Sequence, residues 1–200
     1  MAGDFDADAA LMLRVREGDL EAFEALVEKH KQAIHNFVSR TIGDPTEAED
    51  LTQNVFVQAY KSAARYKAEA RFTTWLFTIA RNLCLNEIRR RTRHPLDSIE
   101  SSQSEEESTA VRQYADTSAL PPSELALREE LESKIEEAIL ALPEKQRMAL
   151  LMCREQELSY EDIAAVLGCS LSATKSLIHR ARETLKAQLK PYLASGKFHP

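Results

Sequence analysis

Residues that break helices divide this chain into apolar segments with helical periodicity. The 200 residues include five glycines and seven prolines, and the interior of an α-helix disfavours both. Between these breaks, apolar side chains recur every three or four residues, as on the buried face of a helix. No segment alternates apolar and polar residues as a β-strand would, and no internal repeat is present. The sequence therefore predicts an all-α fold.

The breaks also place the helices of the first half. They predict amphipathic helices over residues 19–42, 45–66 and 71–93. Gly43 ends the first helix. The second begins at Asp44-Pro45, because Asp suits the N-cap and Pro the first helical position, and Glu47 completes the capping pattern. The third helix is predicted to bury Phe72, Leu76, Ile79 and Leu83.

The composition changes after residue 94. Ser, Glu and Gln cluster between residues 98 and 108, and Pro121 and Pro122 close the stretch. Such a composition is typical of a flexible acidic linker, which we place over residues 95–122. Helical periodicity resumes at Ser123. We therefore expect two small helical domains, residues 8–94 and 123–190, joined by this linker.

The formal net charge of −6 hides an uneven distribution. Residues 51–95 hold 9 basic and 2 acidic residues, and residues 171–200 hold 6 and 1, whereas residues 1–50 hold 5 basic and 12 acidic. Binding to a polyanion depends on the local potential within about 10 Å rather than on the total charge. The two basic segments are therefore candidates for nucleic-acid binding, and ordinary solvated helix faces are the alternative.

The segment over residues 158–185 is typical of a helix-turn-helix motif. It predicts a short helix capped at Ser159, a turn at Gly168 and a second helix that begins after Ser170. One face of the second helix is mostly apolar and carries Leu171, Thr174, Leu177, Ile178, Ala181 and Leu185. The opposite face is polar and carries Ser172, Lys175, Ser176, His179, Arg182 and Lys186.

Such a two-faced helix can dock through its apolar side and enter the DNA major groove. There Lys175 would contact guanine, and Ser176 or His179 would contact base edges. Arg180 and Arg182 better suit phosphates. A plain helical hairpin with a solvated outer face is the alternative.

The third predicted helix combines basic, polar and aromatic side chains. A helical wheel places in one sector Arg71, Thr74, Thr78, Arg81, Asn82, Arg89 and Arg93. Aromatic residues are interleaved with them: Tyr60, Tyr66, Phe72, Trp75 and Phe77. Aromatic rings beside a basic groove suit unpaired bases. Phe72 and Trp75 also lie at core spacing, so burial in the core is the alternative for these two.

A polar strip on the second predicted helix carries few lysines. Its members are Asp50, Gln53, Asn54 and Gln58. A solvated helix face usually holds more charge, so the strip favours a protein partner that demands specific hydrogen bonds. A solvated face is the alternative.

Two parts of the chain resemble bacterial extracytoplasmic-function (group 4) sigma factors of the sigma-70 family. Residues 44–60 (DPTEAEDLTQNVFVQAY) and 72–91 (FTTWLFTIARNLCLNEIRRR) resemble their region 2. Residues 142–147 (LPEKQR) and 158–185 resemble their region 4. Two positions depart from the family pattern, since Asn54 stands where an acidic residue is usual and Leu177 where an arginine is frequent. The resemblance implies a subunit that binds core RNA polymerase and directs it to promoters.

The resemblance also implies which residues act. Core polymerase, through its β′ clamp helices, would be bound by Asp50, Gln53, Asn54 and Phe56. The promoter −10 element would be opened and bound by Tyr66, Arg71, Phe72, Thr74, Trp75, Thr78, Arg81, Asn82 and Arg89. The −35 element would be recognised by Ser172, Lys175, Ser176, His179, Arg180 and Arg182. Further implied partners are the polymerase β flap and an anti-sigma factor, often membrane-bound.

Other classes of protein are disfavoured. The sequence has no Gly-rich phosphate loop, no H-E-x-x-H and no convincing Ser/His/Asp order, so we expect no enzyme, no cofactor, no metal and no small-molecule substrate. The longest uncharged stretch, residues 163–174, is too short to cross a bilayer, and we expect a cytoplasmic protein without direct membrane insertion. The main rival is a helix-turn-helix regulator that is not a sigma subunit, followed by a purely structural helical adaptor.

Overall fold

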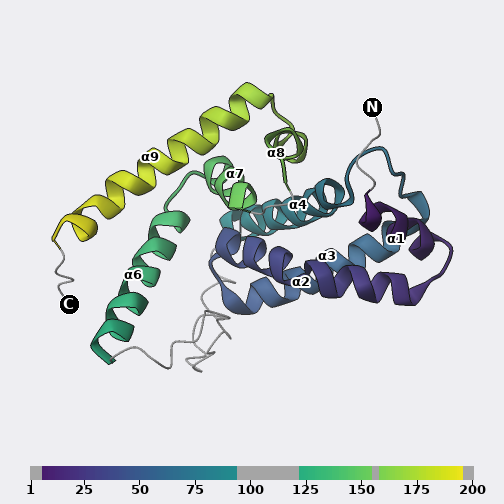
Figure 1. Ribbon diagram of the computed structural model, residues 1–200, viewed down its shortest axis with the longest axis horizontal. Helices are drawn as coiled ribbons and strands as arrows, with labels where there is room; N and C mark the ends of the chain where they lie inside the picture. Colours follow the sequence, from purple (N-terminus) through teal and green to yellow (C-terminus); the bar gives the residue numbers. More distant parts are fainter. Residues whose placement is uncertain (1–5, 94–121, 155–157, 196–200) are drawn as a thin grey trace.

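The computed structural model describes residues 6–93, 122–154 and 158–195, with the side chains of residues 122–127 and 193–195 left out. The predicted linker lies outside the described residues. Within them the regular structure is helical and contains no strand, which confirms the all-α prediction. The elements are α1 (Ala7–Arg16), α2 (Leu20–Ile42), α3 (Pro45–Ser62), η1 (Ala63–Arg65), α4 (Phe72–Arg93), α6 (Pro122–Leu140), α7 (Glu144–Arg154), α8 (Tyr160–Leu167) and α9 (Leu171–Ser195) (Figure 1).

The three helices predicted for the first half are present as α2, α3 and α4. The side chain of Asp44 caps α3 by accepting a hydrogen bond from the backbone N–H of Glu47 (3.1 Å). Gly43 ends α2 with φ +75°, a left-handed conformation that favours glycine. The predicted boundary between α2 and α3 is therefore confirmed.

Helix α1 was not predicted from the sequence. The side chain of Asp6 caps it by accepting from the backbone N–H groups of Asp8 and Ala9. The second Asp6 oxygen accepts from the backbone N–H of Phe72 (2.7 Å) and so joins α1 to the first residue of α4. Met12 and Val15 pack into the core. With only 10 residues, α1 repeats its apolar pattern too few times to be conspicuous.

The buried face of α4 differs in part from the prediction. Phe72 and Leu76 are buried as expected, but Ile79 and Leu83 are only partly buried. The fully enclosed side chains further along the helix are instead Phe77, Ala80 and Cys84. The reason is that α4 is covered from two sides, by the first half and by α8 of the second half.

Helix α9 contains a proline that we expected to lie outside any helix. Pro191 lies within α9, which continues to Ser195. A proline in a helix lacks the N–H that would bond the carbonyl four residues earlier. The helix passes through this position close to its end, where few further backbone bonds depend on it.

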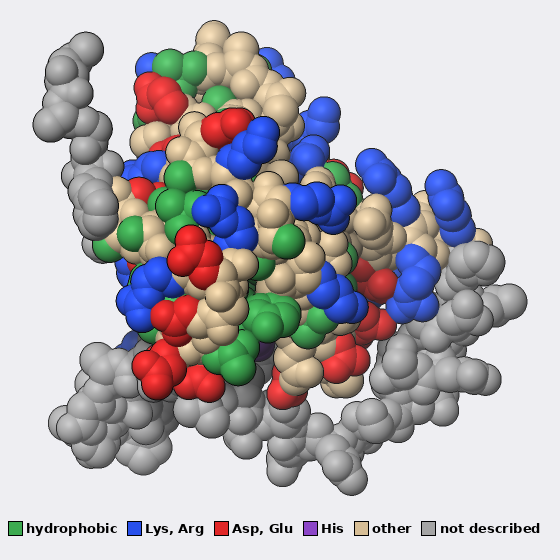
Figure 2. Space-filling model, turned by 90° about the vertical axis from the view of Figure 1, so that its right-hand side faces the viewer, with side chains coloured by type: hydrophobic (Ala, Val, Ile, Leu, Met, Phe, Trp, Pro, Cys, Tyr) green, Lys and Arg blue, Asp and Glu red, His purple; other side chains and the backbone are tan. Residues whose placement is uncertain are grey.

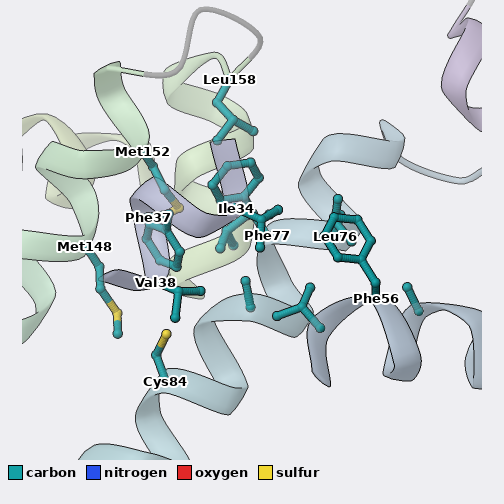
Figure 3. Close-up of a cluster of buried hydrophobic side chains, with 14 of the residues drawn as sticks. Ile34, Phe37, Val38, Phe56, Leu76, Phe77, Cys84, Met148, Met152 and Leu158 are labelled. Carbon is teal, nitrogen blue, oxygen red and sulfur yellow. The ribbon is translucent and has the colours of Figure 1, made fainter. Parts of the chain in front are cut away.

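One apolar core runs through both halves of the molecule. Helix α7 lies against α2, and helix α8 lies against α4. Helix α9 packs on α6, α7 and α8 (Figure 1). At the junction, the second half contributes Met148, Met152 and Leu158. These side chains lie beside Ile34, Phe37, Val38, Phe77 and Cys84 of the first half (Figure 3). The two helical regions therefore form a joint body rather than two separated bundles.

The position of Phe37 at this junction generates a stability prediction. Phe37 is 1% exposed and contacts Phe77 edge-on at 5.4 Å between ring centroids. We expect Phe37→Ala to lower the free energy of unfolding by about 3–5 kcal/mol, because it removes a large buried ring and leaves a cavity. Leu20→Ala on the same helix is the matched control, since Leu20 is 58% exposed. Urea unfolding gives the free energy of unfolding of both variants. An equal decrease for Phe37→Ala and Leu20→Ala would contradict the described core.

Candidate functional site

Helices α8 and α9 form the predicted helix-turn-helix. Ser159 and Asp162 make a reciprocal capping box: Ser159 Oγ accepts from the Asp162 N–H (3.1 Å), and the Ser159 N–H donates to Asp162 Oδ2 (3.0 Å). Gly168 reverses the chain with φ +64°. Ser170 Oγ then accepts from the N–H of Ala173 (3.2 Å) at the start of α9. The predicted caps and the predicted turn glycine are all confirmed.

The two faces of α9 are also as predicted. Thr174, Ile178 and Ala181 are buried, and Leu177 packs partly buried against the core. The predicted −35 residues are exposed, namely Ser172, Lys175, Ser176, His179, Arg180 and Arg182. Four of them line a shallow hollow with Leu171. The structure thus presents short polar and basic side chains on the outer face of a helix whose inner face is anchored.

The residues predicted for −10 DNA differ in exposure. Arg71, Asn82 and Arg89 are exposed, Trp75, Thr78 and Arg81 are half-buried, and Tyr66, Phe72 and Thr74 are buried. Tyr66 and Phe72 lie 5.0 and 5.8 Å from the ring of Trp75, centroid to centroid. In this conformation Tyr66 and Phe72 therefore support Trp75 and offer no open ring face to a base. Burial raises the pKa of the Tyr66 hydroxyl to about 12, and the nearby Asp6 and Asp8 carboxylates add to the rise.

A buried ionic cluster fixes α1 beneath these aromatic rings. Asp8 Oδ2 accepts from Lys29 Nζ (2.6 Å) and lies 2.9 Å from His30 Nε2. The His30 ring is 5.4 Å from Phe72. Burial alone would raise the pKa of Asp8, but the hydrogen bonds and charges of Lys29 and His30 outweigh it, and the pKa lies below its usual value. Asp8 is thus an ionised carboxylate inside the first half.

The arginine run at the end of α4 divides into different roles. Glu87 accepts from Arg90 (2.8 Å) and Arg91 (2.9 Å). Arg90 also pairs with Glu47 of α3 (2.9 Å). Hydrogen bonds from Arg90 first, and then from Arg91, keep the pKa of Glu87 below its usual value. Arg90 thus joins α4 to α3, and Arg91 pairs in addition with Asp44, the N-cap of α3 (3.5 Å). Arg89 is exposed.

The polar strip of α3 borders an apolar groove that sequence reasoning missed. Asp50, Gln53 and Asn54 are exposed, and Phe56 is buried beneath them. The groove has a volume of about 470 Å³ and is lined by Phe23, Val27, Lys31, Thr52, Gln53, Phe56, Val57, Tyr60 and Lys61. Val57 and Tyr60 are 46% and 44% exposed. The only available signal was the apolar periodicity of α2, which suggested core positions for Phe23 and Val27.

Charge is distributed unevenly around these surfaces. Lys and Arg side chains are spread over the face shown in Figure 2, and Asp and Glu side chains gather toward its lower edge beside a hydrophobic patch. Within the described residues no group of His, Cys, Asp or Glu could hold a metal ion. The described helices include none that is long and apolar enough to cross a membrane.

A polar contact joins the two halves on the predicted −10 face of α4. Thr74 Oγ1 donates to Asp162 Oδ1 (2.7 Å), and Arg71 Nη1 lies 4.0 Å from Asp162 Oδ2. Burial raises the pKa of Asp162, but the hydrogen bonds from Ser159 and Thr74 and the charge of Arg71 together lower it below the usual value. Sequence reasoning did not anticipate this contact.

Comparisons with known proteins agree with this geometry. Residues 26–94 match the family model of Sigma-70 region 2, and residues 132–185 match that of Sigma-70, region 4. The chain is 35% identical to the RNA polymerase sigma-H factor of Pseudomonas aeruginosa over 94% of this chain and 96% of that protein. It is 32% identical to the ECF RNA polymerase sigma-E factor of Escherichia coli over 93% of this chain and 96% of that protein. The chain belongs to the ECF sigma factors of the sigma-70 family.

Solved structures extend the likeness to three dimensions. CnrH, in complex with the cytosolic domain of CnrY, has a TM-score of 0.68 and 26% identity, covering 93% of this chain and 99% of CnrH. The sigma factor RpoE of Bartonella quintana was solved in complex with the anti-sigma factor NepR. It has a TM-score of 0.63 and 26% identity, and the match covers 84% of this chain and 96% of RpoE. Because the chain carries sigma regions 2 and 4 and matches sigma factors over nearly its full length, it binds core RNA polymerase and directs it to promoters. A regulator with a helix-turn-helix alone would leave the match over residues 26–94 unexplained.

The buried Asp8 carboxylate generates a prediction on pH. A carboxyl group whose pKa is lower in the folded chain contributes stability that is complete above its unfolded pKa, about 3.9, and is lost as the pH falls through the folded value. We expect Asp8→Asn to lower the free energy of unfolding at pH 7 and to flatten its decline below pH 4. Glu24→Gln, which removes an exposed carboxylate, is the control. If the free energy of unfolding of wild type and of Asp8→Asn fell in parallel with decreasing pH, the stabilising role of the ionised Asp8 carboxylate would be contradicted.

Proposed function

We propose that this sigma factor starts transcription through three separate surfaces. The strip and groove of α3 bind the β′ clamp helices of core polymerase, α4 binds and opens the −10 element, and α9 recognises the −35 element. One observation carries this proposal. A chain of this family combines an outward-facing polar and basic helix face on α9 with an exposed apolar groove whose polar lining residues are Lys31, Thr52, Gln53 and Lys61.

The −35 assignment rests on the outer face of α9. Lys175 and Ser176 lie in its first two turns, where a recognition helix enters the major groove. A bidentate contact to a base contributes about 1–3 kcal/mol of discrimination. Arg180 and Arg182 are exposed beyond them and would bind phosphates, which supply affinity without sequence preference.

The −10 assignment rests on Trp75 and the exposed polar residues of α4. Extruding a base from the duplex costs a few kcal/mol, and stacking on an aromatic ring returns about 1–3 kcal/mol per base. Trp75 is half-buried and braced by Tyr66 and Phe72, so its ring is held in place before DNA arrives. Asn82 is exposed on the same helix, and Arg71 is exposed directly before its first residue. These steps need binding energy and no covalent chemistry from the chain.

The polymerase assignment rests on the groove between α2 and α3. Its apolar floor suits the apolar face of a partner helix, a common mode of recognition in which a helix lies in a hydrophobic groove. Gln53 at its edge supplies directional hydrogen bonds, and Lys31 and Lys61 supply positive charge. We place the β′ clamp helices here and the β flap on the second half of the chain.

Regulation is proposed by analogy with the solved relatives. RpoE of Bartonella quintana was solved with the anti-sigma factor NepR, and CnrH with the cytosolic domain of CnrY. We propose that an anti-sigma factor likewise holds this chain in the cytoplasm, or at the inner membrane where the anti-sigma factor is itself membrane-bound.

The polymerase surface generates a binding prediction. Gln53→Arg is expected to weaken binding of purified core polymerase by about tenfold or more, because it replaces the amide that supplies the hydrogen bonds with a longer side chain at the edge of the groove. Gln32→Arg makes the same exchange at an exposed residue of α2 that does not line the groove. Fluorescence anisotropy with labelled chain measures both affinities. Equal affinities of the two variants would exclude the groove as the polymerase site.

The recognition helix generates a prediction on promoter choice. We expect Lys175→Ala to reduce transcription from a cognate promoter by roughly 5- to 150-fold, which corresponds to the loss of about 1–3 kcal/mol from one base contact. Lys190→Ala, an exposed lysine further along α9, should change it less than threefold. Run-off transcription with saturating core polymerase gives both values. Transcription at the wild-type level by the Lys175→Ala variant would exclude this base contact.

A further inference from the structure

The aromatic rings beside the first turn of α4 depend on how that turn is held. Tyr66 lies 6.3 Å from Phe72 and 5.0 Å from Trp75, and Phe72 lies 5.8 Å from Trp75, between ring centroids. The Tyr66 hydroxyl has no hydrogen-bond partner among the described residues. The Tyr66 side chain is therefore held by ring packing, and its position follows that of Phe72 and Trp75.

The first N–H of α4 is capped by a residue far away in the sequence. Arg71, which directly precedes the helix, has no acceptor atom in its side chain. The backbone N–H of Phe72 donates to Asp6 Oδ2 (2.7 Å), across 66 residues of sequence. An N–H group at a helix start has no partner within the helix, and a carboxylate there also complements the helix dipole. Asp6 thus supplies the acceptor that Arg71 lacks.

The same carboxylate caps a second helix. Asp6 Oδ1 accepts from the backbone N–H groups of Asp8 (3.1 Å) and Ala9 (3.2 Å) at the start of α1. Each oxygen of the carboxylate therefore serves a different helix. Serine has a single side-chain oxygen, and the amide of asparagine replaces one acceptor with a donor. A short side chain needs both carboxylate oxygens to cap α1 and α4 together.

Helix α1 gives Asp6 a fixed position. Asp8 Oδ2 lies 2.6 Å from Lys29 Nζ and 2.9 Å from His30 Nε2, which joins α1 to α2. Met12 and Val15 of α1 are buried. The helix contacts α2, η1 and α4 (Figure 1). The start of α4 is thus bound, through Asp6, to a helix that is anchored in the core.

We propose that Asp6 is a positioning residue for recognition of the −10 element. It holds the first turn of α4 on α1, and thereby orients the Trp75 ring on which an extruded base stacks. This inference rests on the proposed assignment of α4 to the −10 element. Asp6 acts through Phe72 and Trp75 rather than through contact with DNA. Loss of one N-cap changes an equilibrium constant by about fivefold, which sets the size of the expected effect.

Two substitutions separate the two caps of Asp6. Asp6→Ser and Asp6→Asn each keep a side chain that suits the N-cap of α1, but neither keeps a second acceptor for the N–H of Phe72. Asp19→Ser is the matched control, because Asp19 caps α2 through the N–H of Ala22 (3.0 Å). Thermal unfolding verifies that all three variants are folded.

Fluorescence tests the positioning without DNA or polymerase. Trp75 is the only tryptophan of the chain, so the emission reports on this ring alone. We expect both Asp6 variants to raise the acrylamide quenching constant by about 1.5- to 2-fold, because a loosened first turn opens locally and exposes the half-buried ring. Asp19→Ser should leave the constant unchanged. Wild-type quenching in both Asp6 variants would overturn the proposal.

Promoter opening tests the functional consequence. With saturating core polymerase, 2-aminopurine in the −10 element reports the rate of opening. Both Asp6 variants are expected to open a duplex promoter about fivefold more slowly than wild type, and Asp19→Ser at the wild-type rate. A template mismatched across the −10 element removes the cost of extruding bases, so the Asp6 variants should transcribe it at the wild-type level. Wild-type opening by the Asp6 variants, or an equal defect on both templates, would overturn the proposal.

Trp75→Ala separates this inference from the proposed function. If α4 does not open the −10 element, Trp75→Ala opens the duplex promoter at the wild-type rate, and the proposed function fails. Quenching of Trp75 in the Asp6 variants still reports whether Asp6 holds the ring. If Trp75→Ala slows opening and the Asp6 variants do not, the proposed function stands and the positioning role of Asp6 is excluded.

Discussion

The arrangement of the molecule depends on the packing of α7 against α2. Phe37 of α2 lies beside Met152 of α7 (Figure 3), and both are almost completely enclosed. Burial of such side chains contributes about 1.5–3 kcal/mol each, whereas a hydrogen bond contributes about 1 kcal/mol net. Apolar packing therefore holds the halves together, and the Thr74–Asp162 bond fixes where α8 lies on α4. This placement encloses Thr74 of α4.

The three surfaces that we propose for function differ in exposure. The outer face of α9 and the groove between α2 and α3 are exposed, while Thr74 of α4 is enclosed.

Sequence reasoning succeeded where local chemistry decides the structure. The Asp44 cap, the Gly43 and Gly168 turns and the two faces of α9 depend on residues close in sequence, and all were predicted. Burial of Thr74 depends on the contact with α8, which periodicity along α4 does not encode, and Tyr66, which precedes α4, is enclosed by the rings of Phe72 and Trp75. The groove was missed for a related reason: Phe23 has the spacing of a core residue, and only the three-dimensional arrangement shows that α2 and α3 leave it half open.

The most direct test of the account is run-off transcription with purified core polymerase on a library of promoter fragments. The account predicts that core alone gives no specific transcripts, and that added chain produces discrete start sites whose templates share two sequence elements about two helical turns apart. A folded chain that binds core polymerase yet never produces specific start sites would contradict the account.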